Sequence, residues 1–151
     1  MDVDFNIYPR GVWDENDFVV NGKKIDVKAS RSGAKWLLVE CKKLEFRKKE
    51  GIIPFAFVFC ITEWHREHDV PTGRVFLGGF ILTKELCNIE LIGKVRNKNL
   101  CGNKNIIFIP ENGNLPLSGV KLQTDNLACH LDNLCKDRSL FVKLVNQEEI
   151  L

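Results

Sequence analysis

Two aspartates and a lysine near the start of the chain have the side chains that a metal-dependent hydrolase uses. Asp17 and Asp26 carry carboxylates, and Lys28 follows Asp26 by two positions. Carboxylates that face each other across a strand pair repel unless a positive charge lies between them. A divalent metal bound by both aspartates would remove the repulsion, and Lys28 beside it could hold or deprotonate a water molecule. An exposed hairpin with unrelated charges explains the three residues equally well when they are considered alone.

A β-hairpin predicted over residues 17–30 would position these side chains. Apolar β-forming residues flank Asn21-Gly22, and such a pair is typical of a two-residue turn in which both residues have positive φ. Continuing the register that this turn sets places Asp17 opposite Asp26. Since side chains alternate between the two faces of a strand, Lys28 would share their face. The predicted strand pairs are Phe18 with Ile25, Val19 with Lys24, and Val20 with Lys23.

The order of these residues resembles the PD-(D/E)xK nucleases, the restriction-endonuclease-like superfamily. In that family an aspartate precedes a short hairpin, and an acid-x-lysine motif follows on the next strand, here in Ile25-Asp26-Val27-Lys28-Ala29-Ser30. The resemblance implies that Mg²⁺ or Mn²⁺ is held by Asp17, Asp26 and the backbone carbonyl of Val27. It also implies that Lys28 orients or deprotonates the nucleophile during hydrolysis of DNA phosphodiester bonds.

Four further residues are candidates for such a site. A glutamate on a preceding helix often adds a metal ligand in this family, and Glu15 is the nearest candidate, although a salt bridge to Lys28 is an equally good role for it. Glu40-Cys41-Lys42 is a second acid-x-lysine motif, so a rival assignment makes Asp26 the first acid of the site. The turn favours the first assignment because it fixes a register, which the loop before residue 36 does not. The additional candidates are Glu15, Ser30, Glu40 and Lys42.

Basic residues are concentrated around the proposed site, although the net charge of the chain is only +2. Between residues 23 and 49, lysine and arginine are opposed only by Asp26, Glu40 and Glu45. Phosphate contacts supply most of the affinity of a protein for nucleic acid. We therefore expect DNA as the partner, with RNA as an alternative, although a solvated lysine-rich surface explains the same charges. The expected contact residues are Lys23, Lys24, Arg31 and Lys35.

Length and composition favour one domain over residues 1–151, and we expect it to be an α/β domain. The chain has 151 residues, of which 44% are apolar and 28% charged, as in ordinary globular proteins. The resemblance implies a restriction-endonuclease-like fold, with a central mixed β-sheet flanked by helices, and it leaves a homodimer open. No apolar run reaches the about 20 residues that a membrane span needs, and the polar start is not a signal peptide. We expect a cytoplasmic protein with no membrane partner.

Apolar runs and turn residues predict further strands, at residues 36–41, 54–62, 74–82 and 106–109. The polar segment with His65 and His68 is expected to be a surface loop, because its order of residues is not that of a zinc motif. The six cysteines show no zinc-ligand spacing and are expected to be reduced thiols, mostly buried.

Two helices and two less regular segments complete the prediction. One helix is expected to begin with Thr83 as its N-cap, in a Thr-Lys-Glu-Leu segment that extends the family resemblance over residues 17–90. Another is expected to begin at Thr124 or Asp125, with an apolar stripe of Leu127, Leu131 and Leu134. Residues 42–50 are expected to be a charged connection, and residues 141–145 a last strand or a dimer contact.

Overall fold

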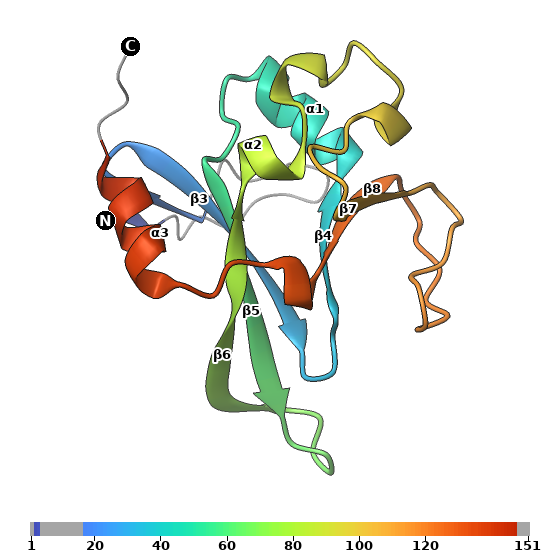
Figure 1. Cartoon of the computed structure of the whole chain (residues 1–151). Helices are drawn as coiled ribbons and strands as arrows, with labels where there is room; N and C mark the ends of the chain where they lie inside the picture. Colours follow the sequence, from blue (N-terminus) through green and yellow to red (C-terminus); the bar gives the residue numbers. More distant parts are fainter. Residues whose placement is uncertain (1, 4–16, 148–151) are drawn as a thin grey trace. The chain divides into compact units, whose positions relative to one another are not determined.

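The computed structural model describes residues 2–3 and 17–147 (Figure 1). Contacts within the chain separate two compact units, each with its own β-sheet. The first unit comprises Met1–Ala34, Pro54–Ile81 and Leu134–Leu151. The second comprises Lys35–Ile53 and Leu82–Asn133. An α/β architecture with a mixed sheet is confirmed.

The first unit is built on a five-stranded sheet in the order β1-β2-β3-β5-β6. The sheet is mixed, because β2 pairs antiparallel with β1 and β3, whereas β3 pairs parallel with β5. The long β3 is therefore the middle strand rather than an edge. The strands are β1 (Asp2–Val3), β2 (Phe18–Val20), β3 (Lys23–Arg31), β5 (Ala56–Trp64) and β6 (Pro71–Leu82).

The predicted hairpin between β2 and β3 is confirmed. Asn21 and Gly22 form the turn with φ angles of 49° and 77°, the positive values that the two-residue turn requires. The three predicted strand pairs are present, namely Phe18 with Ile25, Val19 with Lys24, and Val20 with Lys23. Local turn chemistry was thus sufficient to fix this register.

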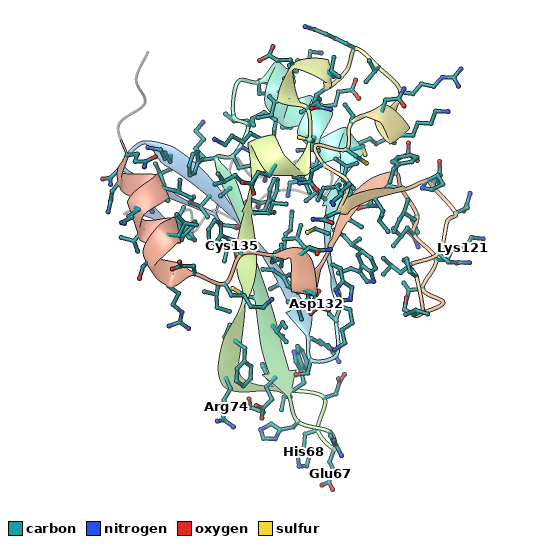
Figure 2. All side chains as sticks on the ribbon, in the orientation of Figure 1. Glu67, His68, Arg74, Lys121, Asp132 and Cys135 are labelled. Atoms are coloured by element: carbon teal, nitrogen blue, oxygen red, sulfur yellow. The ribbon has the colours of Figure 1, made fainter. Side chains whose placement is uncertain are left out.

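The predicted strand over residues 54–62 is β5, and its apolar composition matches its position between β3 and β6. Its first four residues, Ala56 to Phe59, are all buried. A strand in the interior of a sheet is commonly covered on both faces, so apolar side chains are favoured on each face. The polar segment after β5 is a loop, as predicted, and Figure 2 shows Glu67 and His68 at its tip.

The last helix of the first unit, α3 (Arg138–Asn146), occupies the segment expected to be a last strand or a dimer contact. The prediction of a strand is wrong, and the dimer contact stays a prediction. The Asp137 carboxylate caps the helix by accepting a hydrogen bond of 3.0 Å from the Leu140 N–H. The Phe141 ring packs against Phe80 of β6 with 4.9 Å between ring centroids. The cap and this packing stabilise a helix in an apolar run that also suits a strand.

The second unit contains an antiparallel sheet in the order β4-β8-β7. Its strands are β4 (Trp36–Glu40), β7 (Ile106–Ile109) and β8 (Asn126–His130). Both β4 and β7 match predicted strands. Ile109, Leu122 and Ala128 form a buried cluster that supports the sheet.

The middle strand β8 replaces the helix predicted to begin at Thr124 or Asp125, and that prediction is wrong. Leu127, Leu131 and Leu134 have helical spacing, but the first four residues of β8 are buried between two neighbouring strands. A central strand needs apolar side chains on both faces, which the continuous Leu-Ala-Cys run provides. The chain then turns into the short 3₁₀ helix η3 (Leu131–Asn133).

Residues 42–50 were expected to form a charged connection, but the structure has helix α1 (Cys41–Lys49) there, so this prediction is wrong. Cys41, Leu44 and Arg47 are its buried residues, and their spacing of three places them on one face. The remaining positions are largely charged, and this polarity concealed the helical pattern in the sequence.

The helix predicted at Thr83 exists as α2 (Thr83–Leu86) but is only one turn long. Thr83 is its first helical residue, and Leu82 occupies the N-cap position, so the predicted capping role is wrong. The chain continues through the 3₁₀ helices η1 (Ile89–Leu91) and η2 (Asn97–Asn99). Among the residues that the structure describes, no helix is long and apolar enough to cross a membrane.

Candidate metal site on the central strand

Asp17 lies at the point where the β2–β3 ladder ends. The Asp17 N–H donates to the carbonyl of Ile25, whose strand partner is already Phe18, so two consecutive residues face Ile25. This two-against-one arrangement is that of a β-bulge, a feature that redirects side chains. Asp17 is therefore not paired directly with Asp26 in the ladder, which differs from the predicted continuation of the register.

The bulge directs the Asp17 carboxylate to the backbone of β3. Its Oδ2 accepts a 2.5 Å hydrogen bond from the Val27 N–H. In a regular antiparallel ladder, a backbone carbonyl of the neighbouring strand would accept this bond instead. The N–H and C=O of one strand residue point to the same side of the strand. The Val27 carbonyl and the Asp17 carboxylate therefore lie on the same side of β3, next to Asp26.

Asp26 and Lys28 form an ion pair on one face of β3. The distance from Lys28 Nζ to Asp26 Oδ2 is 2.9 Å, with the Lys28 side chain 24% exposed and that of Asp26 only 2% exposed. Lys28 Nζ also lies 6.0 Å from the ring centroid of Phe57, the β5 residue in register with Asp26. A buried carboxylate requires such a partner, because an uncompensated charge in an apolar environment is strongly unfavourable.

The oxygen groups of these residues are of the kind that suits a hard divalent cation. Mg²⁺ and Mn²⁺ favour carboxylate and carbonyl oxygens, the donors that Asp17, Asp26 and Val27 provide. Each carboxylate has two oxygens with several lone-pair sites, so a hydrogen bond at one oxygen leaves coordination by the group feasible. A hydrated ion held by two carboxylates matches the chemistry of Mg²⁺ better than a site made wholly of protein ligands. Within the described residues, no group of three or more His, Cys, Asp or Glu side chains is arranged to hold a metal.

The additional ligand candidates are distributed over several elements. Ser30 lies on β3, two residues beyond Lys28, and its carbonyl accepts a 3.1 Å hydrogen bond from the Thr62 hydroxyl. Glu40 ends β4 and Lys42 lies in α1, both in the second unit. Glu40 was expected to help only if its strand lay beside Asp26, but the neighbours of β3 are β2 and β5. Glu15 lies outside the described residues.

The four residues predicted to contact nucleic acid differ in their exposure and in their contacts within the protein. Lys23 Nζ donates to the carbonyls of Val145 and Gln147 at the end of α3, where a cation is favourable for the helix dipole. This structural role explains Lys23 without nucleic acid. Lys24 is half-buried, and Arg31 and Lys35 are exposed. Lys35 belongs to the second unit.

The Arg31 side chain is held in a cluster that the sequence did not reveal. Its guanidinium lies 3.6 Å from the ring centroid of Trp64 and 2.6 Å from Asp69 Oδ1. The Trp64 indole N–H donates to the Thr62 hydroxyl at 3.0 Å. Stacking and ion pairing orient Arg31 at the surface, beyond the end of β3.

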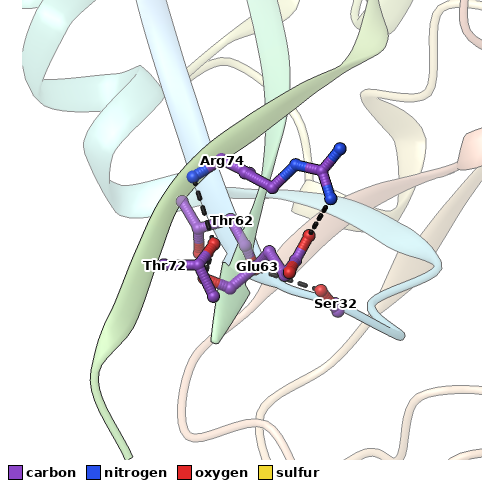
Figure 3. A network of polar contacts seen from close by, with 5 residues as sticks. All are labelled: Ser32, Thr62, Glu63, Thr72 and Arg74. Atoms are coloured by element: carbon purple, nitrogen blue, oxygen red, sulfur yellow. Dashed lines mark hydrogen bonds and ion pairs between the residues drawn. The ribbon is translucent and has the colours of Figure 1, made fainter. Parts of the chain in front are cut away.

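Polar contacts tie together the strand ends beside this cluster (Figure 3). The Ser32 hydroxyl donates to the Thr62 carbonyl at 3.2 Å, and the Arg74 N–H donates to the Thr72 hydroxyl at 3.1 Å. The Arg74 guanidinium lies 3.7 Å from a Glu63 carboxylate oxygen. These contacts stabilise the ends of β5 and β6 but do not contribute to the Asp26–Lys28 site.

An apolar cavity of about 340 Å³ lies elsewhere in the first unit. Val58, Leu77, Phe80 and Phe141 are among its lining residues. Val58 is in register with Val27, and side chains alternate along a strand, so this lining faces away from Asp26 and Lys28. The cavity is separate from the candidate site.

Comparisons with protein-family models, with curated proteins and with solved structures find no match to this chain.

Proposed function

We propose that this chain is a metal-dependent endonuclease that hydrolyses DNA phosphodiester bonds, with a restriction-endonuclease-like fold. The observation that carries the proposal is the convergence at β3: the Asp17 carboxylate bonds the Val27 N–H, and Asp26 lies 2.9 Å from Lys28. These are the positions of the motif that resembles the nuclease family. The proposal includes action in the cytoplasm and as a homodimer. RNA is the alternative substrate.

Each motif residue would have a separate role. Asp17, Asp26 and the Val27 carbonyl would hold Mg²⁺ or Mn²⁺, which supplies positive charge to stabilise the transition state of phosphoryl transfer. Lys28, with its Nζ already oriented by Asp26, would hold a water molecule in line with the phosphorus or accept its proton. Lys24, Arg31 and Lys35 would bind backbone phosphates.

Loss of cleavage in targeted variants tests the proposal. We expect plasmid DNA to be nicked by the wild-type chain in the presence of Mg²⁺ or Mn²⁺, and not by Asp17→Ala or Lys28→Ala. Glu67→Ala serves as a control, because Glu67 is an exposed acid in the loop after β5. Full activity in either motif variant, with the fold verified by circular dichroism, would refute the assignment.

A second candidate is a nucleic-acid-binding or assembly subunit that does not cleave. The burial of Asp26 favours it, because a carboxylate that is 2% exposed and paired with Lys28 can be purely structural. Titration with Mn²⁺ followed by calorimetry separates the two functions. The nuclease should bind Mn²⁺ and lose binding in Asp17→Asn and Asp26→Asn, whereas the subunit should show no heat above that of either variant.

A further inference from the structure

Cys87 and Cys101 of the second unit are brought directly opposite each other by the backbone. They form an isolated antiparallel bridge, although thirteen residues separate them. The Asn88 N–H donates to the Leu100 carbonyl at 2.9 Å, and the Gly102 N–H donates to the Leu86 carbonyl at 3.0 Å. These bonds flank the pair, so Cys87 and Cys101 are a non-hydrogen-bonded pair of the ladder.

The geometry of such a pair suits a disulfide. Residues in a non-hydrogen-bonded antiparallel pair have Cα atoms about 4.5 Å apart, with their side chains on the same face. Disulfide-bonded cysteines have Cα separations of about 4.4 to 6.8 Å. The backbone therefore needs little rearrangement for the two sulfur atoms to bond, although both cysteines are free thiols in the structure.

Side-chain and backbone contacts prevent this register from slipping. Asn88 Nδ2 donates to the Cys101 carbonyl at 3.3 Å, and Asn103 Nδ2 donates to the Glu85 carbonyl at 3.0 Å. At Gly102, an added Cβ would lie 2.3 Å from the Glu85 carbonyl oxygen and 2.8 Å from the Cys87 nitrogen. The two segments approach so closely that only glycine fits at position 102, and this holds the cysteines in place.

We propose that Cys87 and Cys101 form a reversible disulfide in response to a low-molecular-weight disulfide such as oxidised glutathione. Cys101 is partly exposed whereas Cys87 is buried, so the reaction begins at Cys101. The Cys101 thiolate attacks one sulfur of the oxidant and expels one thiolate, giving a mixed disulfide. The Cys87 thiolate then attacks Cys101 Sγ and expels the second thiolate. The pair is oxidised by two electrons, the oxidant is reduced to two thiols, and the two cysteine protons pass to the leaving thiolates.

Burial sets the rate of this exchange. It raises the pKa of Cys87 to about 12 and also raises the pKa of Cys101 above its usual range. The thiolate is the reacting form, so the exchange is slow at neutral pH and selects for oxidants that can approach Cys101. This distinguishes the pair from a catalytic dithiol, whose pKa is lowered.

Cys41 is the competing thiol in this unit. It is buried at the start of α1, and this burial, followed by the influence of Asp125, Cys101 and Cys87, raises its pKa to about 12. Its N–H donates to the Asp125 carbonyl at 2.9 Å, so this backbone group is hydrogen-bonded to a residue outside the Cys87–Cys101 bridge. Cys41 lacks the strand register that places Cys87 and Cys101 opposite each other, and we expect it to remain reduced.

The disulfide would close the loop that contains η1 and η2. This loop is already attached to α1, because Lys48 Nζ donates to the carbonyls of Ile89 and Glu90 at 2.8 and 3.0 Å. A covalent link across a loop of this length constrains the unfolded chain and should raise the Tm of the second unit by about 5 to 10 °C.

The test treats the folded, full-length chain with oxidised glutathione at pH 8, in the presence of a metal chelator. The remaining free thiols are then alkylated, and the protein is digested with trypsin. We expect loss of two of the six thiols, and a disulfide linking peptides 85–94 and 99–104 that dithiothreitol removes. The oxidised protein should also show the higher Tm.

Two variants make the result specific. Cys101→Ser should abolish the linked peptide and the Tm shift, whereas Cys60→Ser, which changes a half-buried thiol in the first unit, should change neither. Retention of all six thiols, a mixed disulfide that stops at Cys101, or a link through Cys41 would overturn the proposal. A Tm increase that persists in Cys101→Ser would overturn it as well.

Discussion

Asp17 has a structural role that can be separated from its proposed role in metal binding. Its carboxylate accepts the Val27 N–H bond at the end of the β2–β3 ladder. The sequence predicted that Asp17 and Asp26 lie near each other, because the Asn-Gly turn determines a local register. It did not predict the β-bulge, since the bulge depends on which backbone donors and acceptors remain after the ladder ends.

Substitution of Asp17 should therefore affect stability as well as activity. Asp17→Ala leaves a partly buried N–H without this acceptor, so we expect a loss of about 1 to 2 kcal/mol in the free energy of unfolding. Asp17→Asn keeps a side-chain oxygen that can accept the bond, and its loss should be smaller. Urea unfolding of the three proteins measures the difference, and equal losses for both variants would show that the Val27 bond does not contribute.

Lys28 can be tested by a change that retains its charge. In Lys28→Arg the guanidinium can still neutralise Asp26, so stability should remain within about 1 kcal/mol of wild type. Arginine does not deprotonate in proteins and positions its donors differently, so cleavage should fall by at least about tenfold. Lys28→Met should lose both stability and cleavage, because it leaves Asp26 as a buried charge. If Lys28→Arg cleaves DNA normally, Lys28 acts only through its ion pair.

At the scale of elements, prediction succeeded where a local interaction determines the structure and failed where a neighbouring element does. The β2–β3 hairpin follows from the φ preferences of two turn residues. By contrast, Leu127 of β8 has helical spacing with Leu131 and Leu134, which lie beyond the strand, and β8 is a strand because it pairs with β4 and β7. Likewise α3 is an apolar run whose Asp137 cap and packing on Phe80 select the helix. Burial by neighbours is not visible in the spacing of residues along one chain.

The hairpin turn gives a prediction at this scale. Gly22 has a φ of 77°, and a Cβ added there would meet no atom within 4 Å. Gly22→Ala should therefore destabilise only through its backbone conformation, by about 1 to 2 kcal/mol. Gly22→Asn should cost less, because asparagine tolerates the left-handed region. Chemical denaturation compares the two variants, and a greater loss for asparagine would contradict the turn geometry.

Asp125 of the second unit provides a test that depends on pH. Hydrogen bonds from Asn97 Nδ2 at 3.0 Å and from the Glu111 N–H at 2.8 Å hold the pKa of this carboxyl below its usual value. A pKa that is lower in the folded state than in the unfolded state stabilises the fold above about pH 4, and this contribution is lost as the pH falls further. Asp125→Asn should show a weaker fall in Tm between about pH 5 and pH 2.5. Parallel Tm curves for the two proteins would show that Asp125 makes no such contribution.

At the scale of the whole molecule, each of the two units contains a feature suited to chemistry among its described residues. The first has the Asp17–Val27 hydrogen bond and the Asp26–Lys28 ion pair at β3, and the second has the opposed thiols of Cys87 and Cys101. The sequence predicted the first as a metal site, because a motif and a turn coincide within a few residues, and that role stays a prediction. It missed the second, because two cysteines with thirteen residues between them give no sign of being close until the backbone between them is placed. The prediction of a single domain over residues 1–151 stays a prediction.

The most direct test of the proposed function is a comparison of wild type and Asp26→Asn on supercoiled plasmid DNA with Mg²⁺ or Mn²⁺. Asparagine nearly preserves the shape of Asp26 but removes the charge that the metal requires. We predict nicking by the wild type, none by Asp26→Asn, and none by either protein with a chelator. Equal nicking by both proteins, or no nicking by a folded wild type on plasmid and branched DNA with either metal, would contradict the assignment of a nuclease.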